Sequence, residues 1–146
     1  MTSTARELAA LTGPLRRGIL RATRSRGSLP NLPDAQVEVL RVLTHKGPLS
    51  PSDIAEALRV AKSTVSNLLK SLQSAGLVER GITASDGRVT LISASPKAMQ
   101  LLSTYDSVSE AVLDDSLARL SAAERAKIGA ALPLLARLSD DLAEQN

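Results

Sequence analysis

Apolar residues recur at helical spacing in the middle of the chain. Between Ala61 and Ala75 they fall at i, i+3, i+4 and i+7, as Val65, Leu68, Leu69 and Leu72. This spacing predicts an amphipathic helix that buries these four side chains. The opposite side carries Ser63, Asn67, Lys70 and Ser74, flanked by Thr64, Ser66 and Ser71.

A shorter helix is expected just before this one. Ser50 can act as N-cap, Pro51 suits the first helical position, and the Asp53 carboxylate can reach back to the cap. Ile54, Ala55 and Leu58 give this helix a short apolar face, and Arg59-Val60 forms the turn between the two helices.

A β-hairpin is expected after the second helix. Gly76 should end that helix in the left-handed conformation, in which only glycine avoids a steric penalty. A strand begins at Leu77, Arg88 to Ser93 alternates like a returning strand, and Gly81 to Gly87 is the predicted loop, or wing. Helix, turn, helix and hairpin together outline a winged helix-turn-helix.

Further helices should flank this unit. The first, Ala5 to Arg26, is interrupted at Gly13-Pro14, which predicts a kink or a restart capped by Thr12 or Gly13. A break from Gly27 to Pro33 separates it from a helix running from Asp34 to about His45, with inward positions expected at Val37, Leu40 and Leu43 or Thr44.

The C-terminal part should form two long helices. Ser95-Pro96 begins one that extends to about Leu120, with an apolar face expected at Met99, Leu102, Tyr105, Val108 or Ser109, Val112 and Leu113. Ser121 to Glu124 is a capping box that begins the last helix, whose apolar stripe is Ile128, Leu132, Leu135, Leu138 and Leu142. This apolar surface exceeds what one small unit can cover, so we expect a homodimer.

The expected fold is therefore mainly α with a small β-hairpin wing. We expect a single domain over 1–146, with a winged helix-turn-helix at 33–95 and dimerisation helices at 1–32 and 96–146. The core must be built from aliphatic residues, because Phe and Trp are absent and Tyr105 is the single aromatic residue.

Composition argues against several function classes. The chain has no cysteine and one histidine, His45, at a helix C-terminus where a cation is favourable, so we expect no metal site and no cofactor. Without a glycine-rich phosphate loop or clustered carboxylates there is nothing to assign as nucleophile or base, and we expect no enzyme. No stretch approaches the roughly 18 apolar residues of a membrane span, so a cytoplasmic protein is expected.

The net charge of +3 is unevenly distributed. Residues 1–32 hold six arginines and one glutamate, whereas residues 96–146 carry a net charge of −3. This asymmetry suggests that the two ends lie against each other. The arginines crowded into the second half of the first helix either offset the acidic C-terminal part or touch DNA phosphates.

The residues of the central segment resemble a known family. The run STVSNLLKSLQSAGLVER, followed by Asp86-Gly87-Arg88 and VTLISASPKA, is similar to the MarR family of bacterial transcriptional regulators. The resemblance implies a recognition helix, a wing tip with an Asp-x-Arg motif, and long flanking helices for dimerisation. It also implies that a small molecule, often phenolic or lipophilic and anionic, binds between the dimerisation helices and the winged helix. The chain departs from many relatives at Ala61, where they have a capping serine, and at Asn67 and Ser71, where they have arginine.

These features make a sequence-specific, dimeric DNA-binding regulator, acting as a repressor on a pseudo-palindromic operator, the leading hypothesis. A face of short polar side chains suits close approach to base edges and phosphates, although an ordinary polar surface helix would look similar. The predicted contacts with double-stranded DNA are Lys62, Ser63, Thr64, Ser66, Asn67, Lys70, Ser71, Asp86 and Arg88. The alternative is a winged-helix module that binds protein instead of DNA.

Overall fold

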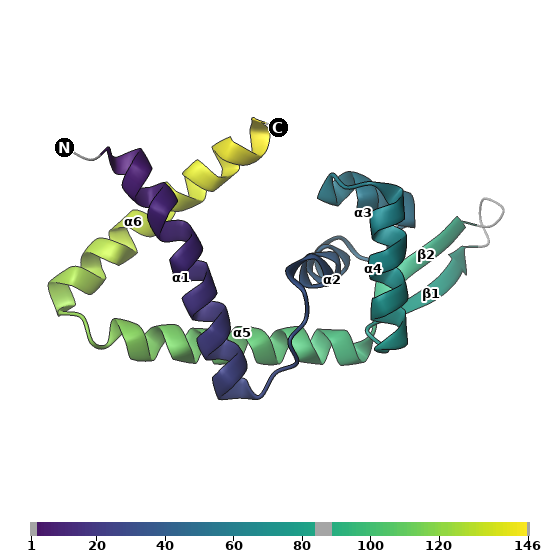
Figure 1. Ribbon diagram of the computed structural model, residues 1–146, viewed down its shortest axis with the longest axis horizontal. Coiled ribbons are helices and arrows are strands. Elements are labelled where there is room, and N and C mark those ends of the chain that lie inside the picture. The colour runs from purple at the N-terminus through teal and green to yellow at the C-terminus, as the bar shows by residue number, and fades with distance from the viewer. Residues whose placement is uncertain (1–2, 84–88, 146) are drawn as a thin grey trace.

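The computed structural model describes residues 3–83 and 89–145. Along this part of the chain the elements are α1 (Thr4–Gly27), α2 (Asp34–Lys46), α3 (Pro51–Leu58), α4 (Lys62–Ser74), β1 (Val78–Thr83), β2 (Val89–Ala94), α5 (Pro96–Leu117) and α6 (Ala122–Glu144). Helices α2 to α4 and the hairpin gather at one end of the molecule, and α1 and α6 cross at the other (Figure 1). Helix α5 runs between the two ends and contacts α1 and β2. The structure thus has the predicted mainly helical fold with a hairpin wing.

The buried core belongs to the winged helix-turn-helix. The largest fully buried apolar side chains come from α2, α3, α4 and β2 and are Val39, Leu40, Ile54, Val65, Leu69, Leu72 and Ile92. Leu68 is half-buried against this cluster, so the predicted inward face of α4 is confirmed. Each aliphatic side chain removed from water contributes about 1.5–3 kcal/mol, and together these side chains hold α4 with its other face outward.

The hairpin is longer than the sequence predicted. The antiparallel register runs from Val78 opposite Ala94 to Thr83 opposite Val89, so Gly81 and Ile82 belong to β1 and the expected wing loop from Gly81 is wrong. Pairing with β2 outweighs the low strand propensity of a single glycine. Residues 84–88, with the tip of the wing, lie outside the described residues.

Helix α1 is continuous through Pro14, so a restart at Thr12 or Gly13 is wrong. Proline removes only one backbone hydrogen bond, and a helix of 24 residues retains the rest. The Ser3 side chain caps the helix by accepting a 3.2 Å hydrogen bond from the Arg6 N–H. The sequence analysis had named no cap at this end of the helix. The Thr12 hydroxyl donates to the Leu8 carbonyl instead of capping a second helix.

The other helix starts follow the predicted caps. The side chains of Ser50, Ser95 and Ser121 each accept a hydrogen bond from the backbone N–H three residues later. Ser121 and Glu124 form the complete capping box at the start of α6. Helix α5 ends at Leu117, three residues before the predicted end, because a short turn ending at Leu120 precedes that box.

The predicted inward faces of α2 and α5 are confirmed at Leu40, Leu43 and Leu102 and differ at single positions. In α2 the buried residues are Val39, Leu40 and Leu43, whereas Val37 is half-buried and Thr44 is exposed. In α5 they are Ala98 and Leu102, and Met99 is 57% exposed. Both helices are touched from more than one side, so their buried face follows their neighbours more closely than the apolar period.

Helix α6 buries no residue within the chain. Large apolar side chains of α1 and α6 are instead exposed: Leu11, Leu15, Ile128, Leu132, Leu134, Leu135, Leu138 and Leu142. None of the helices in the described ranges combines the length and apolarity that crossing a bilayer requires.

Candidate nucleic-acid interface

Helix α4 presents its polar face to solvent at the end of the molecule that carries the hairpin (Figure 1). All seven predicted contact residues on this helix are exposed: Lys62, Ser63, Thr64, Ser66, Asn67, Lys70 and Ser71. Because the opposite face is locked into the core, the helix cannot roll to hide them. The structure therefore brings the α4 part of the predicted site together on one surface.

The N-terminus of α4 is open. Ala61 occupies the N-cap position and supplies no side-chain hydrogen bond, as its sequence predicted. The first backbone N–H groups of a helix then point outward beside the positive end of the helix dipole. Such an end attracts an anion, and Lys62 adds a positive charge at the same place.

The turn between α3 and α4 depends on an unexpected conformation at Arg59. Its φ of 54° lies in the left-handed region, although it is not glycine. The Arg59 N–H donates to the Glu56 carbonyl at 3.2 Å and the Val60 N–H to the Ala55 carbonyl at 3.1 Å, which closes α3 tightly. A single arginine in a sequence gives no sign of this conformation, so the sequence could not predict how α3 is closed before α4.

The other end of α4 is tied to α5. Gly76 has a φ of 71°, as predicted, and turns the chain into β1. Its carbonyl accepts a 2.6 Å hydrogen bond from the buried hydroxyl of Ser95, and the Lys97 ammonium donates to the Ala75 carbonyl at 2.8 Å. These bonds fix the C-terminal end of α4 against the first turn of α5.

The hairpin is joined to α4 by a residue that had no role in the sequence analysis. The Arg80 guanidinium on β1 donates a 3.0 Å hydrogen bond to the Gln73 side chain on α4, and both residues are exposed. Arg80 meets Gln73 only because β1 folds back beside α4, so the sequence alone could not predict this contact.

The predicted wing-tip contacts Asp86 and Arg88 lie outside the described residues and remain predictions from sequence.

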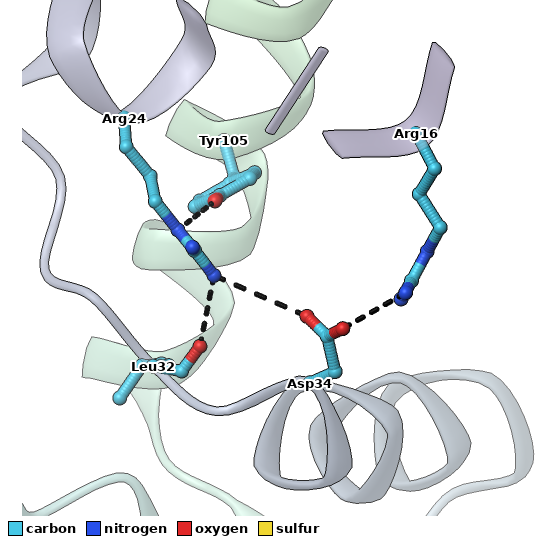
Figure 2. Close-up of polar contacts among 5 residues, drawn as sticks. All are labelled: Arg16, Arg24, Leu32, Asp34 and Tyr105. Atoms are coloured by element: carbon cyan, nitrogen blue, oxygen red, sulfur yellow. Dashed lines mark hydrogen bonds and ion pairs between the residues drawn. The ribbon is translucent and has the colours of Figure 1, made fainter. Parts of the chain in front are cut away.

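Several arginines of α1 bind acidic or carbonyl groups within the chain. Figure 2 shows the Arg24 guanidinium between Tyr105 and Leu32, with Asp34 shared between Arg24 and Arg16. Arg26 pairs with Asp115 of α5. The prediction that these arginines offset the acidic C-terminal part is thus confirmed for Arg26. Asp34 of α2 is a partner of Arg16 and Arg24 that the sequence analysis did not name.

An ion pair also joins α2 to α5. The Arg41 guanidinium donates to both carboxylate oxygens of Asp106, at 2.9 and 2.5 Å. This bidentate hydrogen bonding lowers the pKa of Asp106 below its ordinary value and raises that of Arg41. Both side chains are largely exposed, so the pair contributes modestly to stability.

Metal-ligand side chains do not cluster in the structure. Within residues 3–83 and 89–145 there is no group of three histidine, cysteine, aspartate or glutamate residues placed to hold an ion. His45 is exposed in the last turn of α2, as the sequence predicted.

Known proteins share this arrangement. Residues 31–89 match the model of the MarR family. A transcriptional regulator from Pseudomonas aeruginosa PA01, solved by crystallography, is 30% identical and aligns over 95% of this chain and 98% of its own, with a TM-score of 0.75. MepR, a transcription regulator of the Staphylococcus aureus multidrug efflux pump MepA, has the same fold, with a TM-score of 0.69 over 99% of this chain and 100% of its own at 19% identity.

The curated relatives are also regulators, not enzymes. YdgJ, an HTH-type transcriptional regulator of Bacillus subtilis strain 168, is 27% identical over 108 residues, which are 74% of this chain and 64% of YdgJ. The matched segment 31–89 contains α2, α3, α4 and β1, and hence the exposed polar face of α4. The chain belongs to the MarR family of helix-turn-helix transcriptional regulators.

Proposed function

We propose that this chain is a cytoplasmic, non-enzymatic repressor that binds a pseudo-palindromic DNA operator as a homodimer, with one α4 helix in each half-site. Residues 33–95 read the DNA, and residues 1–32 and 96–146 form the dimer. The observation that carries the proposal is the exposed polar face of α4, which is held outward by its buried leucines beside an open helix N-terminus.

The chemistry of this face suits DNA more than protein. Short serine and threonine side chains let the helix approach base edges, whereas Asn67 can bond bidentately to adenine. Lys62, Lys70 and the open N-terminus of α4 offer positive charge for phosphates on either side.

The apolar surface of α1 and α6 supports the dimer. A cavity of about 530 Å³ lies between these helices and is lined mainly by Leu8, Leu135, Leu138 and Leu142. The two helices are thus loosely packed against each other, and both carry exposed leucines next to this cavity. Together these features leave an apolar surface that a second copy can cover.

A second cavity supports a small-molecule effector. It measures about 410 Å³ and lies between the 28–33 segment, the end of α4 and the start of α5, with lining residues Leu29, Pro30, Leu32, Ala75, Leu77, Lys97, Gln100, Leu101 and Thr104. Its walls are mainly aliphatic and Lys97 is the charged residue among them, so the proposed effector is a lipophilic anion.

Decanoate should weaken operator binding by the wild type and much less by Lys97→Met. If decanol released the wild-type protein from DNA as well as decanoate does, the role of the charge would be contradicted.

Fluorescence anisotropy with the DNA upstream of the protein's own gene tests the proposed function. We expect tight binding that weakens steeply with salt, since each neutralised phosphate releases about 0.9 counterions. Lys70→Gln should reduce the salt slope by about one. Binding no stronger than to unrelated DNA at every salt concentration would contradict sequence-specific regulation by this DNA.

A further inference from the structure

We propose that Arg24 is a positioning residue that sets the operator spacing this regulator accepts, by fixing how the winged helix sits on the dimerisation helices. The inference rests on the proposed function, because spacing has a meaning only when two copies bind one operator. It concerns the junction of α1, α2 and α5, which lies away from the α4 surface (Figure 1).

The Arg24 guanidinium joins three separate parts of the chain. Its Nε donates to the Tyr105 hydroxyl on α5 at 2.9 Å, and its Nη2 donates to the Leu32 carbonyl at 3.0 Å (Figure 2). The same Nη2 lies 4.0 Å from the Asp34 carboxylate, in the first turn of α2. One side chain of α1 is thus bound to the helix that spans the molecule, to the connecting segment, and to the start of the DNA-reading unit.

The connecting segment is irregular, and apart from Arg24 it is held by two backbone hydrogen bonds and by Leu32, which packs against the core. Residues 29–33 form no helix or strand, and Ser28 leaves α1 in a left-handed conformation. Pro33 precedes α2 without a side-chain cap bond, and the Asp34 side chain in the first turn of α2 is held by Arg16 and Arg24. The Leu32 carbonyl would lose a charged donor if Arg24 were shortened.

Arg24 is also the most shielded of the three charged residues at this junction. Its side chain is 27% exposed, compared with 46% for Asp34 and 58% for Arg16. Water screens its hydrogen bonds less than those of the outer Arg16–Asp34 pair. A lysine cannot replace it, because one ammonium cannot match the planar fork that reaches Tyr105 and Leu32 together.

A second connection explains why loss of Arg24 should permit rotation without detaching the unit. Arg41 in the middle of α2 holds Asp106, the residue next to Tyr105 on α5. This pair and the Arg16–Asp34 pair both remain when Arg24 is shortened, so α2 stays attached while the hydrogen bonds to Tyr105 and Leu32 that restrict its orientation are lost. Since α2 and α4 share one buried core, a rotation of α2 turns α4 about its C-terminal end, which is tied to α5, and changes the separation of the two recognition helices in a dimer.

Operators with altered spacers measure this effect. A dyad operator recovered by in vitro selection would be rebuilt with one or two base pairs added or removed between unchanged half-sites, each step turning one half-site by about 34°. For the wild type we expect affinity to fall about tenfold or more at one base pair from the optimum. For Arg24→Lys we expect a lower affinity at the optimum and a loss of about threefold or less per base pair, because a flexible junction adapts to the wrong spacing.

Two further variants separate positioning from stability and charge. Tyr105→Phe removes only the hydroxyl and should flatten the spacer profile in part while the protein stays folded. Arg21→Lys is the matched control, because Arg21 is exposed on the same helix and has no polar partner in the described part of the chain; it should keep the wild-type profile. Thermal unfolding, and titration of the DNA-binding fraction at DNA concentrations above Kd, show whether a variant merely lowers the folded fraction, which would reduce affinity equally at all spacings.

The outcomes distinguish this inference from the function on which it rests. A sharp wild-type profile that stays equally sharp in Arg24→Lys and Tyr105→Phe would overturn the role of Arg24 alone, as would equal flattening in Arg21→Lys. A wild type that selected no dyad DNA would overturn the proposed function itself.

Discussion

Individual side chains of α4 differ in how well they can discriminate between DNA bases. Lys62 and Lys70 meet phosphates, which every operator offers, and the hydroxyls of the serines bond many partners. Asn67 alone on this face carries an amide with a donor and an acceptor in one plane, which matches adenine in the major groove. Base preference should therefore reside mainly at this position.

The first prediction tests that assignment. Asn67→Ala should relax preference at one position of each half-site by roughly 1–3 kcal/mol while leaving binding to other positions selective. Ser74→Ala, at the far end of the same helix, is the control and should keep the full preference, because recognition helices read bases with their N-terminal residues. Affinities for single-base operator variants provide the measurement, and an equal loss for every variant would make Asn67 a backbone contact.

The second prediction at this scale concerns Asp106. Arg41 lowers its pKa in the folded protein, so its stabilising effect is complete above the unfolded value of about 3.9 and is lost as the pH falls through the folded value. Asp106→Asn should reduce the free energy of unfolding by at most about 1 kcal/mol at pH 7, and by progressively less below about pH 4. Urea unfolding between pH 3 and pH 7 measures this, with Asp114→Asn as the exposed control; a difference that grew on acidification would contradict the pair.

At the scale of elements, the sequence predicted the helix boundaries that are set by residues close together in the chain. Helix starts at Ser50, Ser95 and Ser121 were placed correctly because a cap and its N–H partner lie within one turn. The extra length of β1 was not predicted and the continuity of α1 through Pro14 was left open, since strand pairing and helix length override a local breaker there. The left-handed Arg59 has no local signature at all.

The third prediction concerns the tip of the wing. Arg88, predicted from sequence to enter a minor groove beside the half-site, should be held by Asp86. Arg88→Ala should lower operator affinity about tenfold or more, on the order of 1.4 kcal/mol, and leave thermal stability nearly unchanged because an exposed pair is worth about 0–1 kcal/mol. Unchanged affinity in this variant would remove the wing tip from the interface.

At the scale of the whole molecule, the charge asymmetry of the sequence correctly suggested contact between the basic first segment and the acidic last one, which Arg26 and Asp115 make. It could not name the partners, because these residues meet only after the chain has folded back on itself. The unburied stripe of α6 was easier to predict, since its period is read directly from the sequence. Sequence thus identified the surface that needs a partner better than the contacts that orient it.

The fourth prediction tests that surface. Leu135→Glu places a carboxylate among the apolar residues of α1 and α6 and should dissociate or unfold the dimer, because an unpaired buried charge costs several kcal/mol. Arg137→Glu, exposed on another side of α6, changes charge without touching the stripe and should remain dimeric. Sedimentation velocity distinguishes the species; a dimeric, folded Leu135→Glu would place the interface elsewhere.

The most direct test of the whole account is a hydroxyl-radical footprint of the wild-type protein on its selected operator. Two copies that each insert one α4 helix should protect two half-sites related by a dyad, with centres about 10 bp or one helical turn apart. Titration of the same DNA at concentrations above Kd should reach saturation at two chains per operator. A single protected patch without dyad symmetry, saturated by one chain, would contradict the account.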